Sequence, residues 1–394
     1  MRFLLVSTLV VLALAGCDAR IERFEPNQVY AMSLARSRST PSDAALVDAS
    51  AVVEELFGSP DEPRWPPAVA EAMPEVDVAR LARAAGPVSS EQDGTHQGLF
   101  REHCVTCHGL PGSGAGPASL FQNPYPRDFR HGVFKWKATD RYAKPTRDDL
   151  LQLLDHGVPG TAMPSFALLS PDDLNSLLDY VIYLSVRGEV ERTLMTAAID
   201  ELDYGETPPE EDWRLDHDSD TEGREVVDEI LSEVATSWVE ANEQVVSVPT
   251  WTPLEGQALQ ESIVRGKDIF HGQIANCVGC HGPAGDGSTV TLDFDDWTKE
   301  YSTRIGLTPD DREAIRPFRE AGALTPRPVK PRNLQDGVFR GGGDPETLYR
   351  RISQGIAGTP MPAVEVVAED NGKGLTEDQM WDLVRYIQSL ANGL

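Results

Sequence analysis

The 394-residue sequence is poor in basic residues, with 35 Lys and Arg against 63 Asp and Glu, which gives a formal net charge of −28. A surface of this sign repels nucleic acid and anionic lipid head groups, so neither is an expected partner. The sequence also has only five cysteines. An odd number cannot form a complete set of internal disulfides, so the cysteines must serve other purposes.

No apolar run is long enough for a membrane-spanning helix, which needs about 20 residues. The run from Phe3 to Ala15 follows Met1 and Arg2 and is typical of a signal peptide. It ends in Leu14-Ala15-Gly16-Cys17, which resembles the lipobox of bacterial lipoproteins. The resemblance implies that residues 1–16 are removed and that acylated Cys17 anchors an exported protein to a membrane. The alternative is an ordinary signal peptide with an unrelated cysteine.

The residue after Cys17 indicates in which membrane the protein is anchored. Asp18 resembles the inner-membrane retention signal of some Gram-negative bacteria. Together with the lipobox, it favours a protein anchored by lipid on the periplasmic side of a bacterial membrane, most simply the cytoplasmic membrane.

The other four cysteines lie in two copies of one motif. Cys104-Val105-Thr106-Cys107-His108 recurs as Cys277-Val278-Gly279-Cys280-His281. Further blocks recur in the same order: residues 126–135 and 331–340, 146–164 and 344–362, and 169–180 and 375–386. The sequence therefore predicts two copies of one fold, with an insertion at 289–330 in the second copy. A cover for the second site and a partner contact are both open roles for the insertion.

Each copy is predicted to be a small all-α domain, because no segment alternates convincingly as a β-strand does. A helix leads into each C-x-x-C-H motif, a second begins at Thr146 or Asp344, and a third begins at Ser170 or Thr376. These four residues are good N-caps. The apolar spacing after Ser170 and Thr376 is helical.

The C-x-x-C-H spacing suits covalent attachment of a haem. Positions i, i+3 and i+4 of a helical turn share one face, so two thiols and an imidazole point the same way. This arrangement suits two thioether bonds to a haem edge, with the histidine under the iron. The motifs predict two covalently bound haem c groups, on Cys104, Cys107 and His108 and on Cys277, Cys280 and His281. A zinc site and a thioredoxin-like redox pair are the alternatives.

A six-coordinate haem needs a second axial ligand. Met163 and Met361 are the only methionines at equivalent positions in both copies, each in a Thr-x-Met-Pro block. We therefore expect the iron ligands to be His108 with Met163 and His281 with Met361. A role as core filler is the alternative for each methionine. Histidine is the rival ligand, but His131 and His156 have no histidine partner in the other copy.

With these motifs, each copy resembles a class I c-type cytochrome domain. The resemblance covers residues 91–190 and 256–394. It implies a helical fold around covalent haem, ligation by histidine and methionine, and one-electron transfer. It also implies a proline carbonyl that orients the histidine, for which Pro117 is the candidate in the first copy and no clear candidate exists in the second.

Arg127 and Arg332 lie in the repeated Pro-Arg-Asp/Asn blocks. The planar guanidinium of each suits a haem propionate. A surface arginine in a turn is the alternative.

The remaining segments complete the expected organisation: signal peptide 1–16, N-terminal extension 17–90, haem domain 91–190, linker 191–255 and haem domain 256–394. The extension is predicted to be a partly irregular tether or an ordered wrap. The linker is strongly acidic over 200–220, which favours a solvated segment over calcium binding. It then carries the helical stripe Val227, Ile230, Val234 and Trp238, which is expected to dock on a haem domain.

These expectations favour a membrane-anchored dihaem electron carrier, either acting alone or as a subunit of a membrane electron-transport complex, over an enzyme. Methionine on both irons would leave no open position for substrate. The acidic surface would select redox partners with a basic docking patch, or a respiratory or photosynthetic membrane complex. The alternative is a dihaem enzyme, such as a cytochrome c peroxidase or a small-molecule dehydrogenase.

Overall fold

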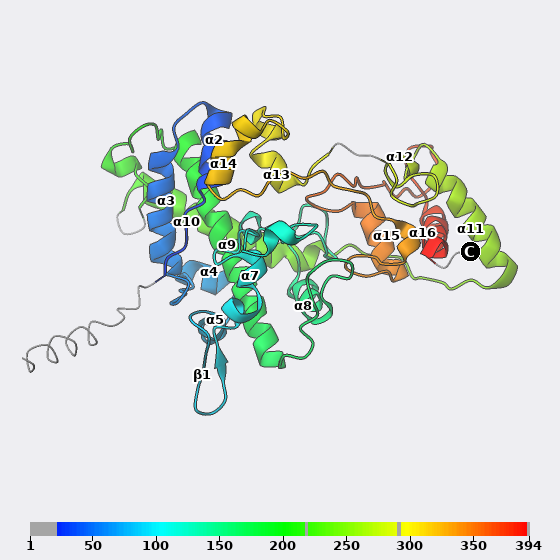
Figure 1. Cartoon of the computed structure of the whole chain (residues 1–394), viewed down its shortest axis with the longest axis horizontal. Coiled ribbons are helices and arrows are strands. Elements are labelled where there is room, and N and C mark those ends of the chain that lie inside the picture. Colours follow the sequence, from blue (N-terminus) through cyan, green and yellow to red (C-terminus); the bar gives the residue numbers. More distant parts are fainter. Residues whose placement is uncertain (1–21, 217–219, 290–292, 392–394) are drawn as a thin grey trace, which may run out of the picture.

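The computed structural model describes residues 22–216, 220–289 and 293–391 (Figure 1). The proposed signal peptide and the Cys17 anchor lie outside the described residues. In the first half of the chain the α-helices are α2 (Gln28–Arg38), α3 (Asp43–Phe57), α4 (Pro67–Ala72), α5 (Val78–Ala84), α6 (Leu99–His103), α7 (Val105–His108), α8 (Arg147–His156) and α9 (Pro171–Asp200). In the second half they are α10 (Glu222–Val239), α11 (Gly256–His271), α12 (Val278–His281), α13 (Asp296–Glu300), α14 (Arg312–Glu320), α15 (Pro345–Gln354) and α16 (Glu377–Ala391).

The fold is all-α. Short 3-10 helices punctuate the loops: η1 (Ser119–Phe121), η2 (Phe129–His131), η3 (Glu211–Trp213), η4 (Glu240–Gln244), η5 (Thr303–Ile305) and η6 (Leu334–Asp336). Within the described residues the only sheet is a hairpin of two-residue strands, β1 (Ser89–Ser90) and β2 (His96–Gln97).

The predicted N-caps begin the repeated helices. Thr146 Oγ1 accepts from the N–H of Asp149 at the start of α8, and the Asp149 carboxylate accepts from the N–H of Thr146. Asp344 caps α15 by accepting from Thr347. The side chains of Ser170 and Thr376 do the same at the starts of α9 and α16. These bonds satisfy N–H groups that have no partner inside a helix.

The first core is centred on α9. It joins the residues before the first motif, such as Leu99 and Phe100, to α9, which is buried on every side over residues 176–188 and holds the fully buried Leu177 and Tyr183. The same core continues through the apolar faces of α3 and α5.

From residue 24 on, the N-terminal extension is an ordered wrap on the first core. Residues 24–85 bury apolar side chains on α9, including Phe57 and Leu81, which are fully buried. Tyr183 Oη donates to the carbonyl of Phe57 over 2.7 Å. Burial of this apolar surface offsets the entropy of ordering a segment that sequence alone left open.

The linker helix docks as its apolar stripe indicated. In α10, Val227, Ile230, Val234 and Trp238 are all buried in the first core. Trp238 Nε1 also donates to the Glu189 carboxylate of α9 over 2.9 Å. The linker thus contacts both folded bodies, because α10 lies in the first core whereas Val248 and Trp251 pack on the second.

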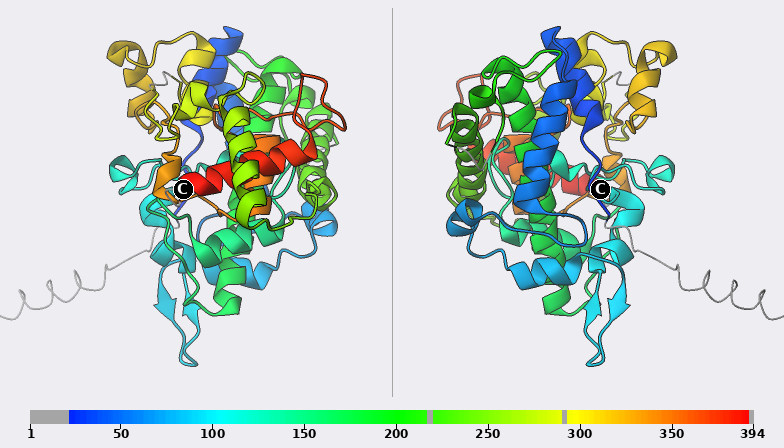
Figure 2. Two further views of the ribbon diagram at one scale, coloured as in Figure 1. Left: turned by 90° about the vertical axis from the view of Figure 1, so that its right-hand side faces the viewer. Right: turned by 90° about the vertical axis from the view of Figure 1, so that its left-hand side faces the viewer.

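The second haem domain has its own smaller core. Phe270 of α11 packs with Leu383 and Val384 of α16 and with residues of α15. Figure 2 shows α16 crossing α11. The two helices approach so closely that a Cβ at Gly266 of α11 would lie 2.0 Å from the carbonyl oxygen of Asp382. Only glycine fits at this position.

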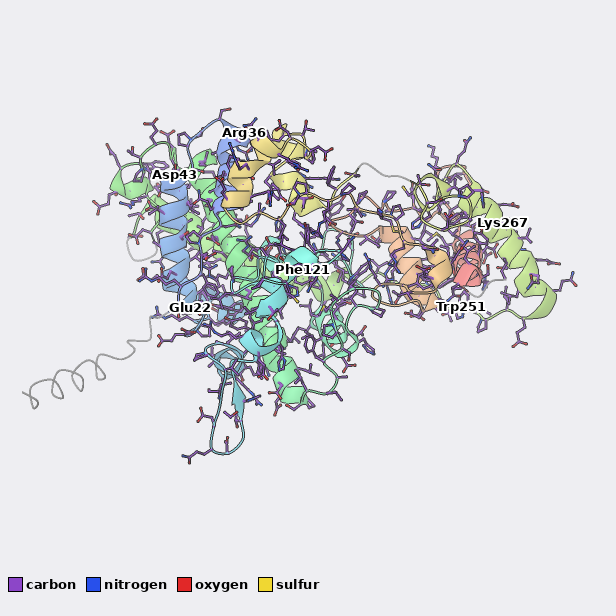
Figure 3. The ribbon with its side chains drawn as sticks, viewed as in Figure 1. Glu22, Arg36, Asp43, Phe121, Trp251 and Lys267 are labelled. Atoms are coloured by element: carbon purple, nitrogen blue, oxygen red, sulfur yellow. The ribbon has the colours of Figure 1, made fainter. Side chains whose placement is uncertain are left out.

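The insertion packs on the first body. Ile315 and Phe318 of α14 form a small cluster with Tyr301, against Met32 of α2. Arg36 of α2, labelled in Figure 3, donates to the carbonyl of Ile305 over 3.2 Å. The insertion thus joins the second copy to the N-terminal helices, as the position of α13 and α14 beside α2 shows in Figure 1.

Among the described residues, no helix is both long enough and apolar enough to cross a bilayer.

Candidate haem centres

Each C-x-x-C-H motif forms a single helical turn. The carbonyl of Cys104 accepts from the N–H groups of Cys107 and His108, over 3.1 and 2.9 Å. The carbonyl of Cys277 accepts from Cys280 and His281 over 3.2 and 2.8 Å. The two copies therefore hold the cysteines and the histidine in the same way, on the shared face that the spacing predicts.

Both motif histidines are oriented by a backbone carbonyl. Nδ1 of His108 lies 3.0 Å from the carbonyl oxygen of Arg127, and Nδ1 of His281 lies 3.0 Å from that of Arg332. A carbonyl only accepts, so each Nδ1 carries the proton and each Nε2 keeps its lone pair. Burial lowers the pKa of His108 to about 4 and also lowers the pKa of His281, so both rings are neutral. A neutral ring with a free Nε2 suits an iron ligand.

The expected role of Pro117 is wrong. The loop around it covers the backbone of α7 instead: Gly116 N–H donates to the carbonyl of Cys107, and Ala118 N–H to that of Thr106. Those amides satisfy carbonyls at the end of the helix, which directs the loop away from the ring edge of His108. The repeated Pro-Arg-Asp/Asn block was the signal for the true acceptors, because it places Arg127 and Arg332 at equivalent positions.

The methionine loops are closed by matching hydrogen bonds. Met163 N–H donates to Thr161 Oγ1 over 3.1 Å, and its carbonyl accepts from Val158 over 3.1 Å. Met361 N–H donates to Thr359 Oγ1 over 3.2 Å, and its carbonyl accepts from Ile356 over 3.3 Å. The Thr-x-Met-Pro repeat therefore specifies one loop geometry twice.

The thiols do not fit the alternatives. Burial raises the pKa of Cys104 and of Cys277 to about 12. Redox-active cysteine pairs need a lowered thiol pKa. Cys104 belongs to the first core and Cys277 packs on the second, so the two pairs do not share a site. Among the described residues, no three His, Cys, Asp or Glu side chains gather as a metal-binding group.

A cationic cluster lies where the two haem domains meet. The guanidinium of Arg127 and the ammonium of Lys135 each lie 4.3 Å from the ring centroid of Trp297. Lys135 also pairs with Asp295 over 2.9 Å. Burial, with smaller contributions from Arg127 and Arg340, lowers the pKa of Lys135 to about 8, although Asp295 opposes the shift. Trp297 lies in the insertion, and sequence reasoning did not anticipate it.

Arg332 and Arg340 extend this cluster from the second domain. Arg332 Nη2 donates to the carbonyl of Val338 over 3.0 Å. Burial lowers the pKa of Arg340, and Arg332 adds to the effect. Within the part of the chain that the structure describes, Nε of each is buried without a hydrogen-bond partner. Such buried donors fit the carboxylates of a haem.

The two candidate centres adjoin one another through reciprocal contacts. A Cβ at Gly160, in the Met163 loop, would lie 3.4 Å from Nη2 of Arg332. A Cβ at Gly358, in the Met361 loop, would lie 3.3 Å from Nη1 of Arg127. Each methionine loop thus touches the arginine whose carbonyl orients the histidine of the other domain.

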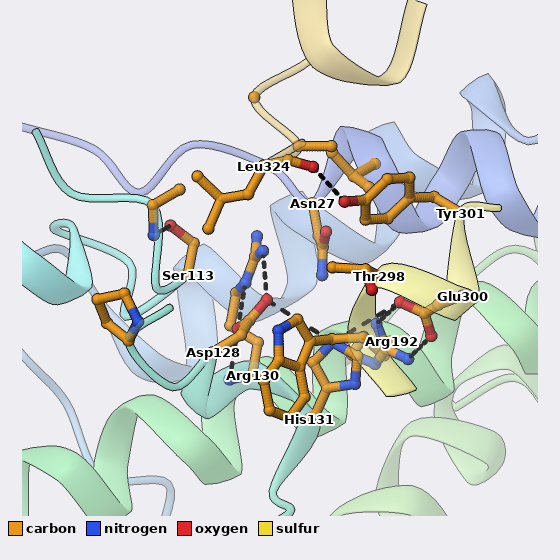
Figure 4. A pocket seen from close by; sticks show the side chains of 16 residues that line it. Asn27, Ser113, Asp128, Arg130, His131, Arg192, Thr298, Glu300, Tyr301 and Leu324 are labelled. Atoms are coloured by element: carbon orange, nitrogen blue, oxygen red, sulfur yellow. Dashed lines mark hydrogen bonds and ion pairs between the residues drawn. The ribbon is translucent and has the colours of Figure 1, made fainter. Parts of the chain in front are cut away.

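A polar pocket lies beside this region (Figure 4). The Asp128 carboxylate accepts from Arg130 over 2.8 Å, and Arg192 pairs with Glu300. His131 Nε2 lies 3.7 Å from both carboxylates. These paired charges join η2 and α9 to α13, so the pocket supports the fold around the first centre.

The comparisons with known proteins agree with this geometry. Residues 92–181 match the family model described as cytochrome c oxidase, cbb3-type, subunit III, and residues 263–391 match the model for cytochrome c. Cytochrome c55X of Stutzerimonas stutzeri is 34% identical over 104 residues, which span 26% of this chain and 75% of that protein. The chain belongs to the c-type cytochromes.

As a c-type cytochrome with two such domains, the protein binds two covalent haem c groups and transfers electrons through them. Among solved structures, the chain is similar to the reducing HAO-like protein complex of Kuenenia stuttgartiensis. That similarity has 23% identity and a TM-score of 0.46, and it covers 77% of this chain and 97% of the other.

Proposed function

We propose that this dihaem cytochrome is an exported, lipid-anchored carrier that relays single electrons between two redox partners. The observation that carries the proposal is the matched geometry of the two centres. In both, a carbonyl orients the histidine and the same hydrogen bonds close the methionine loop. Two alike centres suit a relay better than the division of labour in a dihaem enzyme.

In this proposal Cys104 and Cys107 hold the first haem, and Cys277 and Cys280 hold the second. The haem supplies an iron that alternates between two oxidation states. His108 with Met163 would hold the first iron and His281 with Met361 the second, a pairing that would raise the potential of each iron. The carbonyls of Arg127 and Arg332 fix the ring planes of the histidines, which limits rearrangement during electron transfer.

The propionates would lie in the cationic cluster of Arg127, Lys135, Arg332 and Arg340. Asp295 pairs with Lys135 and offsets part of the charge of these four cations. Carboxylates from the haems would pair with the buried guanidinium donors of Arg332 and Arg340 in this poorly hydrated place. Because the cluster lies between the domains, it supports close approach of the two haems and electron exchange within one chain.

The partners follow from charge. The net charge of −28 favours partners with a basic docking patch, and their association should weaken as salt rises. A subunit role in a respiratory or photosynthetic membrane complex is compatible with the same surface. Domains of this family typically work outside the cytoplasm.

Carbon monoxide tests the assignment as a carrier. Methionine on both irons should keep the reduced protein from binding carbon monoxide rapidly, as followed by its visible spectrum. Rapid binding at one haem, or turnover with added hydrogen peroxide, would favour a dihaem peroxidase instead.

The anchor has its own test. Cys17→Ser should leave both haems in place and move the protein from the membrane fraction to the soluble fraction. Continued membrane association of this variant would contradict lipid anchoring through Cys17.

A further inference from the structure

Arg141 of the first haem domain reaches into the Met361 loop of the second. Its Nη1 donates to the carbonyl of Met361 over 2.7 Å and to that of Gln354 over 3.4 Å. Its Nη2 donates to the carbonyl of Thr359 over 3.0 Å. One planar guanidinium therefore ties both ends of the loop, at the end of α15 and at the methionine itself.

The guanidinium lies against the glycine that follows α15. Gly355 has a φ of +66°, and a Cβ there would lie 2.1 Å from Nη1 of Arg141 and 2.6 Å from the carbonyl oxygen of Met361. The equivalent Gly157 has a φ of +67° and similarly close backbone, so the loop itself requires glycine in both copies. In the second copy the space beside this glycine is filled by the arginine of the other domain.

The backbone that carries Arg141 is itself held in place. Residue 140 donates its N–H to the carbonyl of Gln244 over 2.9 Å, and Val246 donates to Ala138 over 2.9 Å. The Asp140 carboxylate also accepts from the N–H of Tyr142 over 3.0 Å. The linker therefore fixes the strand-like segment from which the guanidinium extends.

The first domain has no equivalent brace by sequence. Its Met163 loop has the same internal bonds as the Met361 loop. However, the segment 136–145 that carries Arg141 corresponds in the second copy to only Gly341, Gly342 and Gly343 between the repeated blocks. The segment that carries Arg141 therefore has no counterpart of similar length in the second copy.

We propose that Arg141 is a positioning residue for Met361, so that the first haem domain sets how firmly the second haem keeps its methionine. The inference rests on the proposed function, in which Met361 is the axial ligand. A soft thioether binds ferric iron less firmly than ferrous iron, so loop rigidity matters most in the oxidised state. Hydrogen bonds from a charged donor supply that rigidity.

Imidazole binding to the oxidised full-length protein tests the inference, because imidazole must displace methionine. The titration should show one binding phase for each haem. Met361→Ala identifies the phase of the second haem, because imidazole should bind more tightly in that phase. Arg141→Gln should tighten that same phase about tenfold, equivalent to about 1.4 kcal/mol, and leave the other phase unchanged. Arg141→Lys, which keeps the charge but not the planar fork, should lie between the two.

Arg327→Gln is the matched control. Arg327 also donates to two carbonyls across the interface, but these belong to Leu120 and Gln122, over 2.7 Å each. It should leave the phase of the second haem unchanged. If Arg141→Gln has no effect on that phase, or if Arg327→Gln tightens it equally, the positioning role is wrong. If Met361→Ala itself leaves the phase unmoved, the failure lies in the ligand assignment of the proposed function.

Discussion

In the first haem domain, the residues before the motif belong to an apolar core that continues through α9 into α3, α5 and α10. In the second, Phe270 lies in a smaller core built mainly by α11, α15 and α16, with Leu334 of η6 and Leu375. The internal hydrogen bonds of the two centres nevertheless match. The comparison teaches that a sequence repeat reproduces the local geometry of a site, while the support around each copy is set by whatever else folds against it.

Replacing each axial methionine gives the sharpest comparison. Met163→Ala and Met361→Ala should each lower the potential of one haem by on the order of 100 mV, since about 59 mV corresponds to a tenfold change in the relative affinity of the ligand for the two oxidation states. Redox titration of each variant measures this. A shift of both potentials by one substitution would show that the centres are not independent.

Replacing one buried phenylalanine in each domain by alanine compares the stability of the two hydrophobic cores. Phe100→Ala and Phe270→Ala each remove a fully buried ring and should each cost about 3–5 kcal/mol. Because the second core is smaller and separate, Phe270→Ala should unfold the second domain first and leave the first intact. Calorimetry should then resolve two transitions. A single transition lowered equally by both variants would show that the two cores unfold together.

Acid should weaken the first body through His131. Burial lowers its pKa to about 4 in the folded chain, against about 6.5 when unfolded. The unfolded chain therefore binds more protons between these values, and stability falls as pH drops from 6.5 to 4. At pH 4.5 the loss is roughly 2–3 kcal/mol relative to pH 7.

His131→Gln should remove that part of the pH dependence, as measured by urea unfolding at pH 7 and pH 4.5. His156→Gln, at an exposed position of α8, is the control and should leave the dependence unchanged. If the free energy of unfolding of His131→Gln falls between pH 7 and pH 4.5 by as much as that of the unaltered protein, His131 is not the source of the pH dependence.

The smallest effect concerns the helix caps. Thr146→Ala and Asp344→Ala remove equivalent N-caps of α8 and α15, and each should cost about 1 kcal/mol. Both haem potentials should stay unchanged, since the caps lie at the far ends of these helices from the methionine loops. Equilibrium unfolding with redox titration checks both statements, and a potential shift in either variant would mean that the cap helps to place the methionine.

Local features of the fold could be predicted from sequence because they depend on neighbouring residues. The C-x-x-C-H turns, the caps at Thr146 and Asp344, and the stripe of α10 all follow from spacing and residue type. The carbonyl partner of His108 was assigned to Pro117 instead of Arg127, because that contact joins two loops and no local rule selects between their carbonyls.

Residue spacing within short segments is enough to specify the two haem-attachment turns, the two methionine loops and the all-α frame. Long-range packing is needed to place the N-terminal extension on α9, the insertion on α2 and Arg141 on the Met361 loop. These contacts join segments far apart in the chain. Their energies come from shared burial and from hydrogen bonds across the domain boundary, which no single segment encodes.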